Sequence, residues 1–351
     1  MERKAHRHIG TPPTIVEVGP VRIGHDLFPV IAGPCAVESE AQINTVAEAV
    51  TEAGASILRG GAWKSTSSPY DFHGLGEEAV DLLVAAGAAV GLPTVTQVLE
   101  AGHVELVADS VDMLEIASGN MQDFELLRLA GRSGRPVLLR RGPSATLDEW
   151  LWAAEYLLAE GNDQVVLVER GIRTFGSGGG DTLDIGAVPT LKETTHLPIM
   201  VDPSHTSGGA ARVRPLALAA QGVGADGLIV EVHDRPELAR TSSSQLGVGT
   251  FEDLMTALGI SRVRRHIDQI DRQIVRLLSR RQELSLQIGR VKQARGLPVH
   301  IPEREQELLE IIREEALHLG VDVDHAVSLF ELVLAESKRL QREEREASVI
   351  L

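Results

Sequence analysis

The feature that most constrains this chain is a series of eight short apolar runs that alternate with amphipathic segments. The runs are FPVIAGP (28–34), ASILRG (55–60), PTVTQV (93–98), DMLEIAS (112–118), PVLLRRG (136–142), QVVLVERG (164–171), PIMVDPS (198–204) and GLIVEVH (227–233). Each run is almost continuously apolar, as expected of parallel strands that are buried on both faces. Eight such units predict a (β/α)8 barrel, and an open doubly wound sheet is the alternative.

The segment before the first run predicts a hairpin, because TIVEV and VRIG flank a Gly-Pro turn within residues 14–31. The first residues, MERKAHRHIGTPPT, are basic but have no apolar core, so we expect no secretion signal. No apolar run approaches the ~18 residues that a membrane helix needs. We therefore expect no membrane partner.

Composition indicates which partners and which cellular compartment to expect. The formal net charge of −16 argues against nucleic-acid binding, which needs a basic face. The chain has one cysteine, Cys35, which rules out an intrachain disulfide and fits a reducing compartment. We expect a cytoplasmic protein.

Polar residues gather where the predicted strands end. Because the carboxyl ends of barrel strands build the active site, this set predicts a site at one end of the barrel. An ion pair that ties loops together is the alternative for any single member. The set is Cys35, Arg59, Lys64, Glu115, Arg140, Arg141, Glu169, Arg170, Arg173, Asp202, His205, Glu231 and His233.

Three members of this set could hold a metal. Cys35, His205 and Glu231 follow the first, seventh and eighth strands, which are neighbours around a closed barrel. Thiolate, imidazole and carboxylate together can bind a divalent transition metal. Cys35 could instead be a small buried residue.

The last third of the chain has a helical pattern. Apolar residues recur at helical spacing over about 35 residues, from a possible N-cap at Ser261 to a stop at Gly296. Two further helices, PEREQELLEIIREEALHLG and VDHAVSLFELVLAESKRLQRE, follow. Three helices of such unequal length bury their apolar stripes poorly alone, so we expect a homodimer or tetramer that assembles through this domain.

The barrel segment resembles the short-chain, type Iβ class of 3-deoxy-D-arabino-heptulosonate 7-phosphate (DAHP) synthases, which are close to the 3-deoxy-D-manno-octulosonate 8-phosphate synthases. The resemblance is carried by IAGPCAVES, LRGGAWK, SSPYDFHGLGE, PVLLRRG, VERGIRTF, TLDIGAVP, LPIMVDPSH and GLIVEVH. It implies condensation of phosphoenolpyruvate with erythrose 4-phosphate, with a divalent metal (Mn, Fe, Co or Zn) at Cys35, His205 and Glu231. The implied substrate-binding residues are Arg59, Lys64, Arg140, Arg170 and Arg173.

Several positions depart from this family: Arg140 stands for a lysine, GGAAR replaces Gly-Gly-Arg-Arg after DPSH, and three further positions lose a charged residue. Thr66 replaces an arginine that grips the aldose phosphate, and Gly119 replaces an arginine at the phosphoenolpyruvate phosphate. Ser242 replaces the aspartate that is the fourth metal ligand. Each charge-assisted contact is worth roughly 1.5–3 kcal/mol, so these losses predict weak metal binding and a lost or redirected condensation. The alternative is that Arg140, Arg141, Arg212 and Arg214 hold the phosphates instead.

The helical segment resembles the all-helical chorismate mutases, which rearrange chorismate to prephenate without a cofactor. The resemblance implies that Arg264 and Arg281 bind carboxylates, that Lys292 and Gln341 contact the ether oxygen, and that Glu305 lies near the ring hydroxyl. The implied catalytic set is Arg264, Arg281, Lys292, Arg304, Glu305, Ser337 and Gln341. A family aspartate is Ile301 here. A solvated basic face is the alternative.

These observations predict a barrel over 1–258, a mutase domain over 261–345 and a tail over 346–351. We favour a working chorismate mutase on a barrel whose original condensation is lost or redirected toward phosphoenolpyruvate or a pyruvyl compound. One alternative is a bifunctional DAHP synthase and chorismate mutase with feedback by prephenate. Another is a barrel that senses a ligand and regulates the mutase.

Overall fold

The computed structural model divides into two compact units, Met1–Val263 and Arg264–Leu351. It describes residues 3–347 apart from 9, 26, 67, 176–180, 207–208 and 242–243, and it leaves out the side chains of 260–269, 272, 346 and 347. Arg264 and Ser242 are among the residues whose side chains lie outside this description.

The first unit is a closed barrel of eight parallel strands. The strands are β3 (Val30–Gly33), β4 (Ile57–Arg59), β5 (Thr94–Val98), β6 (Met113–Ile116), β7 (Val137–Arg140), β8 (Val165–Glu169), β9 (Ile199–Val201) and β10 (Gly227–His233). They pair in chain order, and β10 pairs with both β3 and β9, which closes the sheet. The eight predicted runs are therefore confirmed as strands, and the open-sheet alternative is wrong. A two-residue strand, β11 (Leu246–Gly247), pairs with the end of β10.

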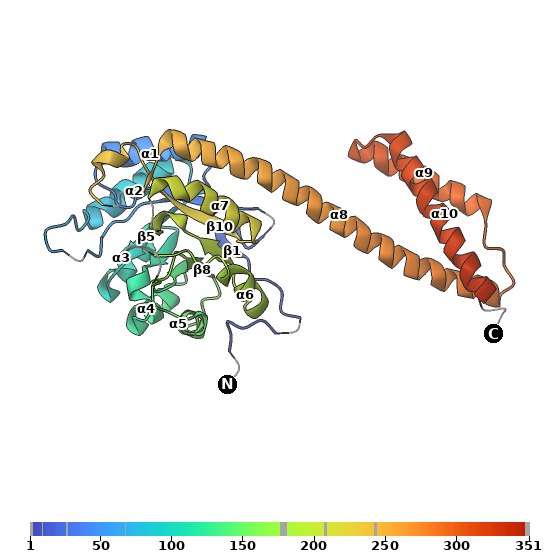
Figure 1. Ribbon diagram of the computed structural model, residues 1–351, viewed down its shortest axis with the longest axis horizontal. Helices are drawn as coiled ribbons and strands as arrows, with labels where there is room; N and C mark the ends of the chain where they lie inside the picture. The colour runs from blue at the N-terminus through green and yellow to red at the C-terminus, as the bar shows by residue number, and fades with distance from the viewer. Residues whose placement is uncertain are drawn as a thin grey trace. The chain divides into compact units, whose positions relative to one another are not determined.

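The barrel helices lie outside the strands (Figure 1). They are α1 (Glu40–Glu52), α2 (Glu77–Val90), α3 (Val104–Ser110), α4 (Phe124–Arg132), α5 (Leu147–Ala159), α6 (Ala187–Thr194) and α7 (Val213–Gly222). Capping side chains stabilise the N-termini of several of these helices. Ser39 caps α1, Asp123 caps α4, and Thr146 with Glu149 forms a capping box on α5. Their apolar faces and the outward faces of the strands form one large core.

The interior of the barrel has two layers that follow from the two-residue period of a strand. Ile57, Met113, Leu138, Met200 and Ile229 point inward and form an apolar layer. Two residues further along each strand, the inward positions carry polar groups: Arg59, Glu115, Arg140, Asp202 and Glu231. Because side chains alternate between the two faces of a strand, the charged residues form a separate layer next to the apolar layer.

The predicted hairpin closes the apolar layer. Strands β1 (Val16–Val18) and β2 (Val21–Ile23) pair antiparallel, and Val16, Val18 and Ile23 pack against the inward apolar residues of the barrel. The hairpin thus plugs one end of the barrel and leaves the polar layer at the other end.

Gly33, at the end of β3, is required by close approach of two backbones. Its φ is +148°, and a Cβ there would lie 2.0 Å from the carbonyl oxygen of Arg59. A side chain at this position would therefore push apart the strands that carry Cys35 and Arg59.

The second unit is helical. It consists of the later part of α8 (Val248–Ala294), with α9 (Pro302–Leu319) and α10 (Val323–Ala347), and α9 packs along α10 (Figure 1). Gly296, with φ of +67°, follows α8 as predicted. The prediction that Ser261 begins a helix is wrong, because α8 starts at Val248 and continues through it. Gly259, two residues before Ser261, costs only about 1 kcal/mol and does not break the helix.

The first turns of α8 belong to the barrel core, where Phe251, Leu254 and Leu258 are buried. Within the described part of the chain, no helix combines the length and apolarity that a membrane crossing requires.

Candidate active sites

The polar layer of the barrel is built from ion pairs that are almost wholly buried. The guanidinium of Arg59 donates to Glu231 at 2.8 Å, and the two side chains are 2% and 0% exposed. Arg140 contacts two carboxylates, Glu115 at 2.9 Å and Asp202. Gln97, on β5, donates its amide to Glu115. The layer therefore opposes two guanidinium groups with three carboxylates, and His205 lies beside two of these.

These neighbours keep the buried carboxyl groups ionised. Burial alone would raise the pKa of Glu115, but the facing guanidinium of Arg140, helped by Arg59, lowers it to about 2. Burial also acts on Glu231, where His205 and Arg59 lower the pKa to about 2. The pKa of Asp202 lies well below its usual range because His205 and Arg140 outweigh burial.

The three predicted metal ligands lie in one neighbourhood. His205 Nε2 is 3.5 Å from Glu231 Oε1, and His205 Nδ1 is 3.1 Å from Asp202. Cys35 is close enough that the charge of Glu231 adds to burial in raising the pKa of its thiol. Lys64 donates to the backbone oxygen of Cys35 at 3.2 Å.

A divalent transition metal fits this donor set in part. Glu231 Oε2 is buried and has no hydrogen-bond partner among the described residues, so one carboxylate oxygen is available. Thiol, imidazole and carboxylate are also suitable ligand types. No group of three such residues is already drawn together in the described part of the chain, and Ser242 lies outside it. The retained residues therefore fit a metal by chemistry and lack a preformed cage.

Outside the barrel interior, the cations are also paired or exposed. Arg141 donates to Glu169 at 2.8 Å and to Asp184 at 2.9 Å, and Arg170 pairs with Asp181. Arg173 is exposed, and its backbone N–H donates to the carbonyl of Pro143. Burial raises the pKa of Glu169 despite its contact with Arg141. The structure therefore joins Arg141 and Arg170 to carboxylates that the sequence did not assign to them.

Two of the positions that depart from the family pattern, Thr66 and Gly119, lie within the described residues, and their surroundings differ. The Thr66 hydroxyl donates to the carbonyl of Ser68, which is a local loop contact. Gly119 opens onto a hollow of about 260 Å³, and a Cβ there would meet nothing within 4 Å. The hollow contains one carboxylate and no base, so it is a poor receptor for a phosphate. Its lining is Ser118, Gly119, Met121, Gln122, Gly142, Pro143, Ser144, Ala145 and Glu149.

The helical unit contains a cavity of about 340 Å³ that brings together six of the seven predicted mutase residues. The seventh, Arg264, lies among the residues whose side chains are not described. Most of the remaining wall is apolar, as expected for a small organic ligand. The lining is Arg281, Ser285, Ile288, Lys292, Val299, Ile301, Arg304, Glu305, Leu308, Leu334, Ser337, Lys338 and Gln341.

Hydrogen bonds orient the polar groups of this cavity. Arg281 donates to the Ser337 hydroxyl at 2.6 Å, and Lys292 donates to the carbonyl of Val299 at 2.8 Å. Gln341 donates to the carbonyl and hydroxyl of Ser285. Burial lowers the pKa of Arg281, although not enough to remove its charge at neutral pH.

Lys338 is the charged member of this cavity that the sequence reasoning missed. Its ammonium lies 2.9 Å from Glu305 Oε2. The signal was available, because Leu334, Lys338 and Gln341 follow one another at helical spacing and therefore share a face of α10.

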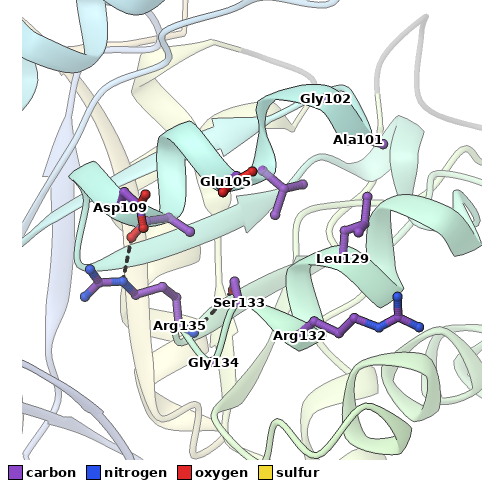
Figure 2. Close-up of a pocket in the computed structure, with 11 residues that line it drawn as sticks. Ala101, Gly102, Glu105, Asp109, Leu129, Arg132, Ser133, Gly134 and Arg135 are labelled. Carbon is purple, nitrogen blue, oxygen red and sulfur yellow. Dashed lines mark hydrogen bonds between the residues drawn. The ribbon is translucent and has the colours of Figure 1, made fainter.

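Another hollow of the barrel unit lies away from the polar layer. It measures about 740 Å³ and lies between α3 and α4 (Figure 2). Glu105 and Asp109 line one side, whereas Arg132 and Arg135 line the other. Both arginines already have acceptors, Glu160 and the carbonyl of Ala108. Nothing in this hollow is an unpaired buried group that points to a ligand.

Comparison with family models gives two matches. Residues 10–260 match the DAHP synthetase I family, and residues 263–342 match chorismate mutase type II.

Individual relatives agree with the first match. A phospho-2-dehydro-3-deoxyheptonate aldolase of Thermotoga maritima is 44% identical over 243 residues, which cover 69% of this chain and 72% of the relative. A 2-dehydro-3-deoxyphosphooctonate aldolase of Rhodopseudomonas palustris is 31% identical and covers 70% of this chain and 92% of the relative.

Solved structures give the same result. The crystal structure of a DAHP synthase from Thermotoga maritima matches with a TM-score of 0.70 and 41% identity over 73% of this chain and 75% of that one. A truncated form of the synthase from the same organism matches with a TM-score of 0.68 and 40% identity, over 73% of this chain and 94% of that one.

Proposed function

Because the chain belongs to the DAHP synthetase I family and also carries a chorismate mutase type II domain, we propose that its helical unit converts chorismate to prephenate. The observation that carries this proposal is the cavity lined by Arg281, Lys292, Arg304, Glu305 and Gln341. With Lys338, four cations and one carboxylate line it, which suits a substrate with two carboxylates.

The proposed reaction is pericyclic, so it needs no nucleophile and no cofactor. It needs a compact substrate conformation and positive charge where the ether oxygen becomes negative. Arg281, which is oriented by Ser337, would bind a carboxylate. Lys292 and Gln341 would donate to the ether oxygen, and Arg304 would bind at the open rim, where it is exposed.

The test is chorismate consumption by the full chain, with prephenate identified as the product. A Gln341→Leu variant, which replaces the amide donor with an apolar group of similar size, should be slower by about 10²-fold. A wild-type chain that leaves chorismate unchanged contradicts the proposal.

We also propose that the helical unit forms a homodimer. Apolar side chains are exposed along the second half of α8, including Ile270 (54%), Leu277 (69%) and Ile288 (55%). A stripe of this length is unusual on a monomer, and a second copy of the same helix supplies a matching apolar surface. Sedimentation equilibrium of the full chain tests this, and a monomer at micromolar concentration contradicts it.

For the barrel, we propose that a pyruvyl or enolpyruvyl compound binds among Arg59, Lys64, Arg140, Arg170 and Arg173, and that the family's condensation with an aldose phosphate is weak. The support is the charge balance at the mouth: Arg59, Arg140, Arg141 and Arg170 each face at least one carboxylate. Little positive charge is left over for two phosphate dianions. The hollow at Gly119, which has no base, supports the same conclusion.

When a divalent transition metal is bound by Cys35, His205 and Glu231, it supplies Lewis-acid polarisation of a carbonyl group. Around it, Lys64 and Arg59 would orient the pyruvyl carboxylate. The Cys35 thiol must lose its proton to become a ligand, and its raised pKa makes this step less favourable.

The second candidate for the barrel is the complete DAHP synthase reaction, and the 44% identity to a phospho-2-dehydro-3-deoxyheptonate aldolase favours it. A third, a sensing module without chemistry, would show as ligand-dependent mutase kinetics. The assay that separates them is phosphoenolpyruvate consumption with erythrose 4-phosphate and Mn²⁺. Robust turnover supports the complete reaction and contradicts our proposal for the barrel.

A further inference from the structure

Lys338 and Glu305 form an ion pair across the wall of the mutase cavity. Lys338 belongs to α10 and Glu305 to α9, and the ammonium nitrogen lies 2.9 Å from Glu305 Oε2. Both line the cavity, and their side chains are 28% and 24% exposed. His300, which is half exposed, lies 3.5 Å from the same carboxylate oxygen. The Glu305 carboxylate is therefore paired with a cation, Lys338, that also lines the cavity.

The other polar groups of the lining that are next in sequence to this pair already have partners, because Arg304 donates to Glu307 and Ser337 accepts from Arg281. Ile301, Leu308 and Leu334, which also lie near the pair in sequence, are apolar. At the position of Ile301 a carboxylate would have given the ring substituent a second acceptor. The pair therefore offers a ring substituent both a donor and an acceptor on this side of the cavity.

A donor and an acceptor side by side suit a hydroxyl group. A hydroxyl both donates and accepts, so it can bond to the Glu305 carboxylate and to the Lys338 ammonium together. An amino group in its charged form only donates, and it would bring a second positive charge beside Lys338. Selectivity of this kind comes from repulsion of the wrong ligand as much as from attraction of the right one.

We propose that Lys338 is a specificity-determining residue, which with Glu305 selects a cyclohexadienyl dicarboxylate bearing a ring hydroxyl over its analogue bearing a ring ammonium. This inference rests on the proposed mutase function of the cavity. It goes beyond that function because it assigns to Lys338 a discrimination between two substrates that share the same carboxylates and ether bridge.

The experiment measures kcat/KM of the full chain for chorismate and for 4-amino-4-deoxychorismate. The variants are Lys338→Met, which removes the charge but keeps the length, and Lys338→Arg, which keeps the charge. In wild type we expect a strong preference for chorismate. In Lys338→Met we expect this preference to fall by about tenfold, mainly through a lower KM for the amino compound. Lys338→Arg should retain most of it.

Arg339→Met is the matched control. Arg339 is the next residue of α10 and pairs with Glu336 and Glu343 on the exposed surface, outside the cavity. It should leave the ratio of the two kcat/KM values unchanged. If Lys338 only ties α10 to α9, then Lys338→Met slows both substrates equally and the ratio does not move, which overturns the inference.

Other outcomes distinguish a failure of this inference from a failure of the proposed mutase function. Wild type that converts both compounds equally, or prefers the amino compound, overturns the role of Lys338 and leaves the mutase proposal standing. A chain that converts neither compound overturns both.

Discussion

Arg59 and Glu231 face each other across the barrel interior at 2.8 Å, with almost no exposure to solvent. One comes from β4 and the other from β10, so the contact spans strands that are not neighbours in the sheet. Taking two charges out of water is costly, and the pair is tolerable because each ion satisfies the other. The same rule applies to Arg140 with Glu115 and Asp202.

Acid should destabilise the barrel over a defined range of pH. Glu115 and Glu231 have pKa values lowered from 4.5 to about 2. Their stabilisation is therefore complete above pH 4.5 and is lost as the pH falls toward 2, and it amounts to several kcal/mol in total. Denaturant unfolding monitored at pH 7, 4.5 and 3 should show a drop that is concentrated below 4.5. A flat profile would contradict these ion pairs.

Arg140→Leu should destabilise the barrel by about 3–5 kcal/mol, because it leaves Glu115 and Asp202 buried without a cation. Arg132→Leu removes an arginine that pairs with Glu160 on the outside of the barrel. That control should cost much less, because an exposed pair contributes little to stability. Urea unfolding of the two variants makes the comparison, and equal losses would show that burial of the pair has no special weight.

Lys292→Ala should lower mutase turnover by about 10²-fold or more, because it removes a cation placed to stabilise the ether oxygen. Arg290→Ala is the control on the same helix, since Arg290 pairs with Glu344 at the surface. Rates of chorismate loss under saturating substrate give the result. Unchanged turnover in Lys292→Ala would remove this residue from the mechanism.

Metal binding should be weak in the wild-type barrel and stronger in Ser242→Asp. Three ligands remain, and an anionic fourth ligand would hold a divalent cation more tightly. Elemental analysis of protein purified without chelator should find less than one Mn, Fe, Co or Zn per chain. Titration with Co²⁺ should show a thiolate absorption band that Cys35→Ser removes. A full equivalent of tightly held metal in wild type would show that Ser242 is no handicap.

Condensation of phosphoenolpyruvate with erythrose 4-phosphate should be negligible in wild type and partly restored by Thr66→Arg, Gly119→Arg and Ser242→Asp together. Gly119 has open space around its missing Cβ, so it can accept a side chain. The alternative in which Arg140 and Arg141 take over phosphate binding is weakened by their contacts, because both are engaged by carboxylates. Phosphoenolpyruvate consumption with added Mn²⁺ measures the outcome, and robust wild-type turnover would contradict the prediction.

The sequence alone predicted the features that depend on local pattern. Each of the eight apolar runs contains one of the strands β3 to β10, although most runs extend beyond the strand ends. The hairpin at 16–23 and the helices α9 and α10 followed from the same period and turn rules. It also predicted that Arg281, Lys292 and Gln341 belong to one site, because they match the mutase family. The helix start predicted at Ser261 is wrong because helix α8 has no strong break there, and a serine within a helix resembles a serine at its start.

Only the tertiary structure decided which charges meet. The two-residue period of a strand places Arg59, Glu115, Arg140 and Glu231 in the barrel interior. It does not predict that Arg59 pairs with Glu231, or that Arg140 pairs with Glu115 and Asp202. Lys338 and Glu305 lie 33 residues apart on different helices, and their contact depends on how α9 packs along α10. Local pattern is set by sequence neighbours within a few residues, whereas ion pairing is set by distances of a few ångströms between chain segments that folding brings together.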